Sequence, residues 1–275
     1  MGAAIFLDYR FRLQPLMTLL SRLADRLVLQ PTTNPIDTED RERRWIETPS
    51  GKIEIWVCHS PAESSAQTTP LLMLKFPGTG GRAERARNFP AQLWPNFETE
   101  VWTVNHRGYG GSSPPASLQN FTESCDALWN AAVKQFPNRK ILIYGNSLGC
   151  ISALYLAARH HITGLFLRNP PALAQMIATR PRYRNWSLGL SKLIASQIPD
   201  QLDSVANATQ CKAPCLFVCS EKDTVVPPKY QNLIIDAFHG PQRKFTIEGA
   251  NHPDPIPDHQ QDEFLAAIDW LGKRL

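Results

Sequence analysis

The sequence predicts an α/β domain with a mostly parallel, twisted sheet of about eight strands and helices on both faces. Short apolar segments of strand length alternate along the chain with segments of helical periodicity. The chain has 275 residues, 43% of them hydrophobic, which suffices for one domain with a large core. Its formal net charge of +4 comes without a long run of lysine or arginine, so binding to nucleic acid is not expected.

Strand and helix segments alternate from residue 44 onward. The segments 44–48 and 52–58 flank a Pro-Ser-Gly turn and are expected to form a hairpin. Later strands are expected over 71–76, 100–105, 140–144, 164–168, 214–219 and 243–247, and helices over 82–94, 123–135, 148–160, 186–198, 229–238 and 260–271. The less regular segment 170–210 lies between two strands, so it is the candidate for a short lid in a fold with little or no cap.

Residues 1–40 are expected to form an amphipathic helix and a polar linker ahead of the main domain, 41–275. Apolar residues recur at i, i+3, i+4 and i+7 over 11–29, with several arginines mainly on the other side. This apolar stripe either packs on the domain or lies on an anionic membrane surface, and both placements are open. No stretch of about 18 uninterrupted apolar residues occurs, so no spanning helix is expected.

A G-x-S-x-G motif stands where a strand is expected to meet a helix. The apolar segment 141–144 leads into Gly145-Asn-Ser147-Leu-Gly149, and an Ala/Leu-rich helical segment follows. Such a turn strains the serine backbone and raises its Oγ above the sheet edge, while the glycines let helix and strand approach. The helix N-terminus adds a positive dipole end where negative charge develops. The motif predicts Ser147 as a nucleophile, with an incidental serine in a glycine-rich turn as the alternative.

Two later strands end in loops that carry an acid and a histidine. Strand 215–219 leads into Glu-Lys-Asp223-Thr-Val-Val-Pro, and strand 244–248 leads into Gly-Ala-Asn-His252. These loops resemble those of the α/β-hydrolase family, in which nucleophile, acid and histidine follow in that order. Asn-His-Arg-Gly-Tyr-Gly-Gly-Ser-Ser over 105–113 is similar to another loop of the family. The resemblance covers about 44–272 and is closest to the serine aminopeptidase-like, dienelactone-hydrolase-like and acyl-thioesterase branch.

The resemblance implies a catalytic triad of Ser147, Asp223 and His252. Glu221 is a rival acid two residues earlier, and an alternative role for Asp223 is to cap the helix that begins near Pro228. The other histidines lie where the triad would not place its base. They include His106, His160 and His161.

The oxyanion hole implied by the resemblance departs from the family's pattern. Its loop usually begins His-Gly, but here residues 76–81 read Phe-Pro-Gly-Thr-Gly-Gly. Because the hole uses backbone N–H groups, loss of the histidine side chain need not abolish it. The expected donors are the N–H groups of Leu148 and Thr79, with Gly80 as the alternate and the Thr79 hydroxyl as a candidate third donor. No Gly-Lys-Ser/Thr follows, so a phosphate-binding Walker loop is not expected.

The resemblance implies hydrolysis of a carboxylic ester or thioester, with a small-molecule or acyl substrate and neither a metal nor an organic cofactor. A peptidase of the same fold is one alternative. A non-catalytic binding protein is the other, because fold does not determine function.

The six cysteines are expected to be reduced thiols. Cys211, Cys215 and Cys219 are evenly spaced, which invites a metal-binding interpretation. A buried strand is favoured instead, because the segment 215–219 is apolar and no histidine is close in sequence. No secretory signal is evident, so the chain is expected in the cytoplasm, with membrane contact through residues 11–29 as an open alternative. Oligomeric state is not indicated.

Overall fold

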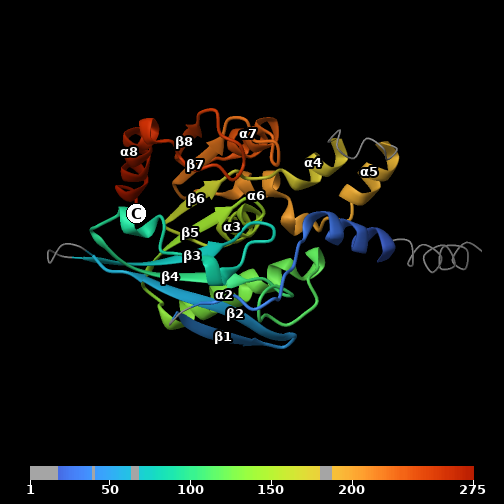
Figure 1. Cartoon of the computed structure of the whole chain (residues 1–275), viewed down its shortest axis with the longest axis horizontal. Helices are drawn as coiled ribbons and strands as arrows, with labels where there is room; N and C mark the ends of the chain where they lie inside the picture. Colours follow the sequence, from blue (N-terminus) through green and yellow to red (C-terminus); the bar gives the residue numbers. More distant parts are fainter. Residues whose placement is uncertain (1–17, 39–40, 63–67, 180–187) are drawn as a thin grey trace, which may run out of the picture.

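The computed structural model describes residues 18–38, 41–62, 68–179 and 188–275. In these ranges eight strands form one twisted sheet, in the order β1-β2-β4-β3-β5-β6-β7-β8 (Figure 1). The strands are β1 Glu42–Thr48, β2 Gly51–Ser60, β3 Thr69–Phe76, β4 Phe97–Asn105, β5 Lys140–Asn146, β6 Gly164–Arg168, β7 Cys215–Ser220 and β8 Gln242–Ile247. β2 pairs antiparallel with β1 and with β4, and the other pairs are parallel. The expected sheet, with its initial hairpin, is confirmed.

Helices cover both faces of the sheet, as expected. One face is covered by α2 Phe121–Gln135, α3 Gly149–Ala157, α6 Ser204–Gln210 and α7 Pro228–Ala237, and the other by α8 Gln261–Gly272. Side chains of β3 alternate between the two layers: Leu72 and Leu74 join the first, and Leu71 and Met73 the second. All four are fully buried, which explains the uninterrupted apolar segment in the sequence.

Lys75 is the one charged residue of the buried strand β3. Its ammonium donates hydrogen bonds to the carbonyl oxygens of Arg87 (2.8 Å) and Phe89 (2.6 Å) and lies 4.8 Å from the centre of the Tyr144 ring. Burial lowers the pKa of Lys75 to about 8. The two carbonyl groups replace water around the ammonium and attach the segment after β3 to the sheet.

The prediction of a helix over 82–94 is wrong. Two short 3-10 turns, η1 Ala83–Arg85 and η2 Ala91–Leu93, stand in its place. Pro90 has no N–H to donate, and a proline disfavours helical backbone at the residue before it. The carbonyl groups that would accept helical hydrogen bonds bind Lys75 instead. This tertiary contact outweighs the apolar periodicity of the segment.

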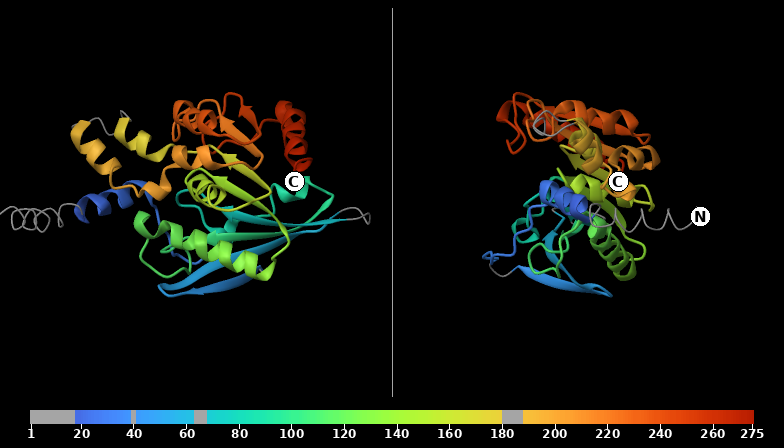
Figure 2. Two further views of the ribbon diagram at one scale, coloured as in Figure 1. Left: turned by 180° about the vertical axis from the view of Figure 1, so that it is seen from behind. Right: turned by 90° about the vertical axis from the view of Figure 1, so that its right-hand side faces the viewer.

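The segment between β6 and β7 forms further helices beyond the carboxyl ends of the strands. α4 Leu173–Thr179 and α5 Leu188–Ala195 pack against each other. Figures 1 and 2 both show them at one end of the molecule together with the N-terminal helix, and α8 at the other end. The helix expected over 186–198 is observed as α5, with 186–187 outside the described residues. A lid role for 170–210 stays a prediction.

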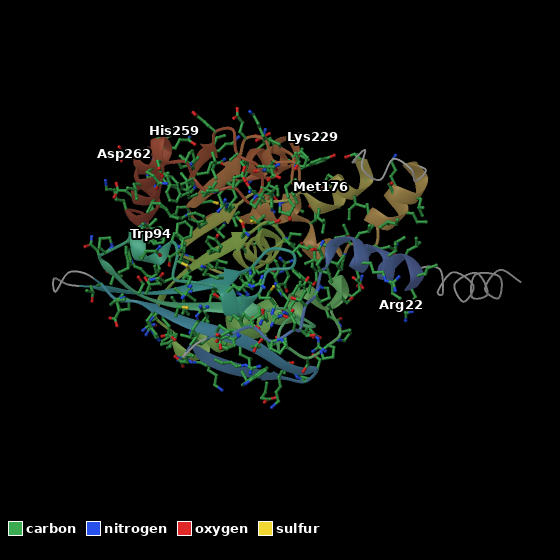
Figure 3. The ribbon with its side chains drawn as sticks, in the orientation of Figure 1. Arg22, Trp94, Met176, Lys229, His259 and Asp262 are labelled. Carbon is green, nitrogen blue, oxygen red and sulfur yellow. The ribbon has the colours of Figure 1, made fainter. Side chains whose placement is uncertain are left out.

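The N-terminal helix, residues 18–28, packs on the domain. Its buried side chains, four residues apart, join one apolar cluster with α3, α4 and α5. They are Leu20, Ala24 and Val28. Arg22, labelled in Figure 3, lies exposed on the side away from α4. Packing of the stripe is therefore confirmed for the described part, whereas 11–17 fall outside it, and membrane contact by the outer side stays a prediction.

None of the helices in the described ranges is both long and apolar enough to cross a membrane. All six cysteines are free thiols, and Cys215 and Cys219 are buried in β7. Burial raises the pKa of the Cys219 thiol to about 12, so it stays protonated at neutral pH.

We expect Leu20→Ala to destabilise the protein by about 2–5 kcal/mol, because it leaves a cavity under the N-terminal helix. Leu19→Ala is the matched control, since Leu19 is 63% exposed and Leu20 only 4%. The control is expected to change stability by about 0.5 kcal/mol or less. Urea unfolding monitored by circular dichroism measures both. Equal midpoints for the two variants would contradict the packing of this helix.

Candidate active site

Ser147 occupies the sharp turn between β5 and α3. Its backbone is left-handed, with φ of 51°, a conformation that is costly for a residue other than glycine. Its N–H donates to the carbonyl of Arg168 at the end of β6 (2.8 Å), and its own carbonyl accepts from the N–H of Cys150 (2.9 Å). The turn is therefore held by the neighbouring strand and by the start of α3.

Two positions flanking this turn have no room for a side chain. A Cβ on Gly149 would overlap the backbone carbonyl of Phe76, and one on Gly145 would come within 2.6 Å of the Cys150 Cα. Glycine at both positions lets α3 begin directly against β3 and β5. The spacing of the G-x-S-x-G motif thus follows from the packing of this helix on the sheet.

A cavity of about 540 Å³ lies at Ser147, within the size range of small-molecule sites. Ser147 is 8% exposed and shares the cavity lining with Thr79, Leu148 and His252. Side chains of the N-terminal helix and of α4 form much of the remaining wall. The cavity thus joins four of the residues predicted from sequence to the N-terminal helix and α4.

Asp223 and His252 come from the loops that follow β7 and β8. His252 Nδ1 lies 2.7 Å from Asp223 Oδ2. The Asp223 side chain is fully buried, whereas that of His252 is 16% exposed. When the neutral imidazole donates Nδ1–H to the carboxylate, its Nε2 is left as a hydrogen-bond acceptor. The structure therefore pairs the acid and the histidine that the resemblance implied.

Asp223 also organises its own loop. Its Oδ1 accepts from the N–H groups of Val225 (2.8 Å) and Val226 (2.7 Å), and its Oδ2 from the side-chain amide of Gln231 (3.2 Å). The alternative role as a cap of α7 is not observed, because Pro227 is the N-cap residue of that helix and no side chain caps it.

Glu221, the rival acid, is exposed and holds a different group. Its carboxylate accepts from the N–H of Gly249 at 2.6 Å. Backbone hydrogen bonds from Glu221 to Ile247 (3.1 Å) and from Lys222 to Ala250 (2.8 Å) run alongside. Glu221 therefore joins the acid loop to the histidine loop, and in the described contacts Asp223 is the acid that meets the imidazole.

Two asparagines to which the sequence assigned no role tie the same loops together. Asn169 is buried at φ of 50°, accepts from the N–H of Ser220 (2.8 Å) and donates to the carbonyl of His252 (3.2 Å). Asn251 accepts from the N–H groups of Thr224 (2.9 Å) and His252 (2.8 Å). The one sequence signal for Asn169 is its place directly after a strand, where asparagine tolerates left-handed backbone.

The backbone N–H groups of Leu148 and Thr79 belong to residues that line the cavity. Gly78 lies so close that a Cβ built on it would stand 3.2 Å from the Ser147 Cβ. Across the described part of the chain, neither N–H donates to another protein group. Both donors are therefore available to a bound ligand beside the serine.

Two details of the expected oxyanion loop differ from expectation. Gly80, the alternate donor, does not line the cavity and lies beside the Gln30 side chain instead. The Thr79 hydroxyl is not a third donor to the site, because it donates to the carbonyl of Val28 at 3.2 Å. That bond attaches the end of the N-terminal helix to the loop.

The histidines other than His252 lie outside the cavity. His106 is buried between Phe121 and Phe76, with ring centres 3.9 and 5.8 Å away, and its Nε2 lies 3.1 Å from the Ser152 hydroxyl. Burial lowers the pKa of His106 to about 3. His160 stacks on Trp129 at 4.3 Å, and His161 is exposed. Among the described residues, no group of three or more His, Cys, Asp or Glu side chains is placed to hold a metal ion.

Comparison with known proteins identifies the architecture. A family model described as the alpha/beta hydrolase fold matches residues 73–198, which include Thr79 and Ser147. The chain has the α/β-hydrolase fold. The expected resemblance to this family is confirmed, and the matched region ends before Asp223 and His252.

Curated relatives of this chain are distant. Alpha/beta hydrolase domain-containing protein 17B of Xenopus laevis is 22% identical over 169 residues, which are 61% of this chain and 55% of the relative. An uncharacterised protein of Mycobacterium tuberculosis is 28% identical over 195 residues, 70% of this chain and 66% of the relative. The matches therefore span less than two thirds of either relative's length.

Solved α/β structures are similar over most of the chain. Est1E from Butyrivibrio proteoclasticus has a TM-score of 0.61 at 17% identity, covering 84% of this chain and 98% of Est1E. The acetyl xylan esterase from Paenibacillus sp. R4 has 0.61 at 16%, covering 94% and 93%. A serine hydrolase without lid from Xanthomonas campestris has 0.56 at 15%, covering 88% and 97%. At these identities the likeness is one of fold.

Acid should destabilise the protein through His106. The pKa of His106 is about 3 in the folded protein, whereas an ordinary histidine has a pKa of 6.5. Between pH 3 and pH 6.5 this imidazole is therefore protonated in the unfolded chain and neutral in the folded protein. Its contribution to stability is present above pH 6.5 and falls on acidification, by about 1.4 kcal/mol per pH unit. Urea unfolding between pH 7 and pH 4 should show a shallower slope for His106→Gln. His59→Gln, at a ring that is 61% exposed, is the control and should keep the wild-type slope; equal slopes for both variants would contradict this account.

Proposed function

We propose that this chain is a serine hydrolase that cleaves a carboxylic ester or thioester through an acyl-enzyme. The observation that carries the proposal is the 2.7 Å contact between His252 Nδ1 and Asp223 Oδ2. His252 lines the same cavity as Ser147. The left-handed backbone of Ser147 at the turn supports it, because such strain is characteristic of a nucleophile turn between strand and helix.

In the proposed reaction, His252 Nε2 accepts the hydroxyl proton of Ser147 as Oγ bonds to the acyl carbonyl carbon. The carbonyl electron pair moves to oxygen, then returns as the bond to the alcohol or thiol breaks, and His252 gives its proton to this leaving group. Water repeats the sequence on the acyl-enzyme and releases the acid. Asp223 keeps the Nδ1–H tautomer and stabilises the imidazolium.

The oxyanion would bind to the N–H groups of Leu148 and Thr79. Both residues line the cavity beside Ser147, and neither N–H has a protein acceptor among the described residues. Leu148 is the N-cap residue of α3, so the positive end of that helix dipole lies at the same place. Fixed donors of this kind stabilise the charge without reorganisation during the reaction.

The solved proteins of similar fold support an ester as the substrate of this chain. One neighbour is an acetyl xylan esterase, and Est1E has been solved with ferulic acid bound. A peptidase of the same fold is the alternative, so an aminoacyl amide belongs beside p-nitrophenyl esters and an acyl-CoA in the substrate panel.

Ser147→Ala should lower kcat for p-nitrophenyl butyrate by about 10⁴-fold or more, because it removes the nucleophile and leaves only the binding contribution. The melting temperature should stay at or above that of the wild type, since the strained turn keeps its other contacts. A purified, folded variant with wild-type activity would show that another residue is the nucleophile.

Asp223→Asn should lower kcat by about 10⁴-fold, far more than Glu221→Gln. The Asn carbonyl can still accept from the loop N–H groups, but its NH₂ would face His252 Nδ1 and force the wrong tautomer. In Glu221→Gln the amide oxygen can still accept from Gly249, so little change is expected. Steady-state kinetics on one ester compare the two, and equal losses would remove Asp223 from the proposed triad.

A further inference from the structure

We propose that the N-terminal helix and α4 form the two walls of an acyl-chain pocket, and that the preferred substrates carry an extended apolar acyl chain. This inference rests on the proposed hydrolase function. It concerns residues 18–28, which precede the region matched by the family model. It therefore assigns a specificity role to a part of the chain outside that region.

The N-terminal helix and α4 give the cavity an apolar side that supports an apolar ligand, whereas the polar residues of the lining belong to other segments. From the N-terminal helix come Leu27 and Val28, and from α4 come Leu173, Met176 and Ile177. Met176, labelled in Figure 3, lies on α4 at the end of the molecule that the N-terminal helix occupies. All five side chains are apolar, so this side of the cavity offers no side-chain hydrogen bond to a polar substrate group. Such walls bind a substrate by removing its methylene groups from water.

The wall from the N-terminal helix is held in place at its cavity end. The carbonyl of Val28 accepts from the Thr79 hydroxyl (3.2 Å), and the N–H of Gln30 donates to the Tyr109 hydroxyl (3.0 Å). One turn earlier, Asp25 accepts from the N–H of Leu118 at 2.8 Å. A wall anchored in this way is already formed before substrate binds, which limits the entropy lost on binding.

The same anchoring places the helix next to the reacting atoms. Thr79, whose hydroxyl holds Val28, is also the residue whose N–H is proposed to bind the oxyanion. An acyl group with its carbonyl oxygen at Thr79 and Leu148 therefore has the Leu27 and Val28 wall close to its first carbons. Each methylene group that reaches the wall should raise kcat/KM about fourfold, until the cavity is filled.

The test compares chain-length preference in wild type and in a variant with a filled wall. Leu27→Trp should lower the ratio of kcat/KM for p-nitrophenyl octanoate to that for p-nitrophenyl acetate at least tenfold. Leu19→Trp is the matched control on the same helix, because Leu19 is 63% exposed, and its ratio should equal that of wild type. Met176→Trp on α4 should reproduce the effect of Leu27→Trp, so that the result does not depend on the correct folding of one variant.

Hydrolysis with the same ratio in all variants would overturn the acyl pocket while leaving the hydrolase function intact. A second measurement does not depend on turnover: decanoate should raise the melting temperature of Ser147→Ala, and should not do so when Leu27→Trp is added. If wild type hydrolyses no ester in the panel, the proposed function fails, and the decanoate result decides the pocket alone. Absence of any effect of decanoate on the melting temperature of Ser147→Ala would overturn the acyl-chain pocket.

Discussion

The buried carboxylate of Asp223 is the group on which the candidate site depends. A carboxylate removed from water costs several kcal/mol unless hydrogen bonds compensate it. Here one oxygen accepts from Val225 and Val226 and the other from His252 and Gln231. The conformation of the acid loop and the orientation of the imidazole are therefore coupled. Neither can change without leaving a buried charge short of partners.

The parallel sheet brings these groups together because the carboxyl ends of neighbouring strands meet at one edge. Ser147 follows β5, Asn169 follows β6, Asp223 follows β7 and His252 follows β8, and these four strands are adjacent in the sheet. Asn169 follows the strand that lies between those of the nucleophile and the acid, and it forms hydrogen bonds to both Ser220 and His252. Residues distant in the chain thus converge through strand order alone.

Much of the fold and of the candidate site follows from local sequence patterns. Strands buried on both faces have uninterrupted apolar sequences, and the turn at Ser147 needs glycine at fixed spacing. The strands and the turn were therefore predictable. Segment 82–94 was not, because its carbonyl groups bind Lys75, a contact that no local pattern reveals. The same holds for the Thr79 hydroxyl, whose partner Val28 lies 51 positions earlier in the chain.

The N-terminal helix shows that local sequence patterns also fail to reveal the contacts that determine specificity. Its apolar periodicity predicts burial of one side, and Leu20 and Ala24 are buried accordingly. That its last turn lines the cavity beside Ser147 depends on hydrogen bonds to Thr79 and Tyr109, which are distant in sequence. Periodicity therefore identifies which side of a helix is covered, while the tertiary contacts decide what that side does.

The most direct test of the central claim is covalent labelling with a fluorophosphonate, followed by mass spectrometry of the intact chain and of its peptides. An activated serine should take up one adduct per chain, located on the peptide that contains Ser147. His252→Ala should abolish the adduct, because the hydroxyl then has no base to accept its proton. A folded wild-type protein that takes up no adduct, or takes it up on a different residue, would contradict the account.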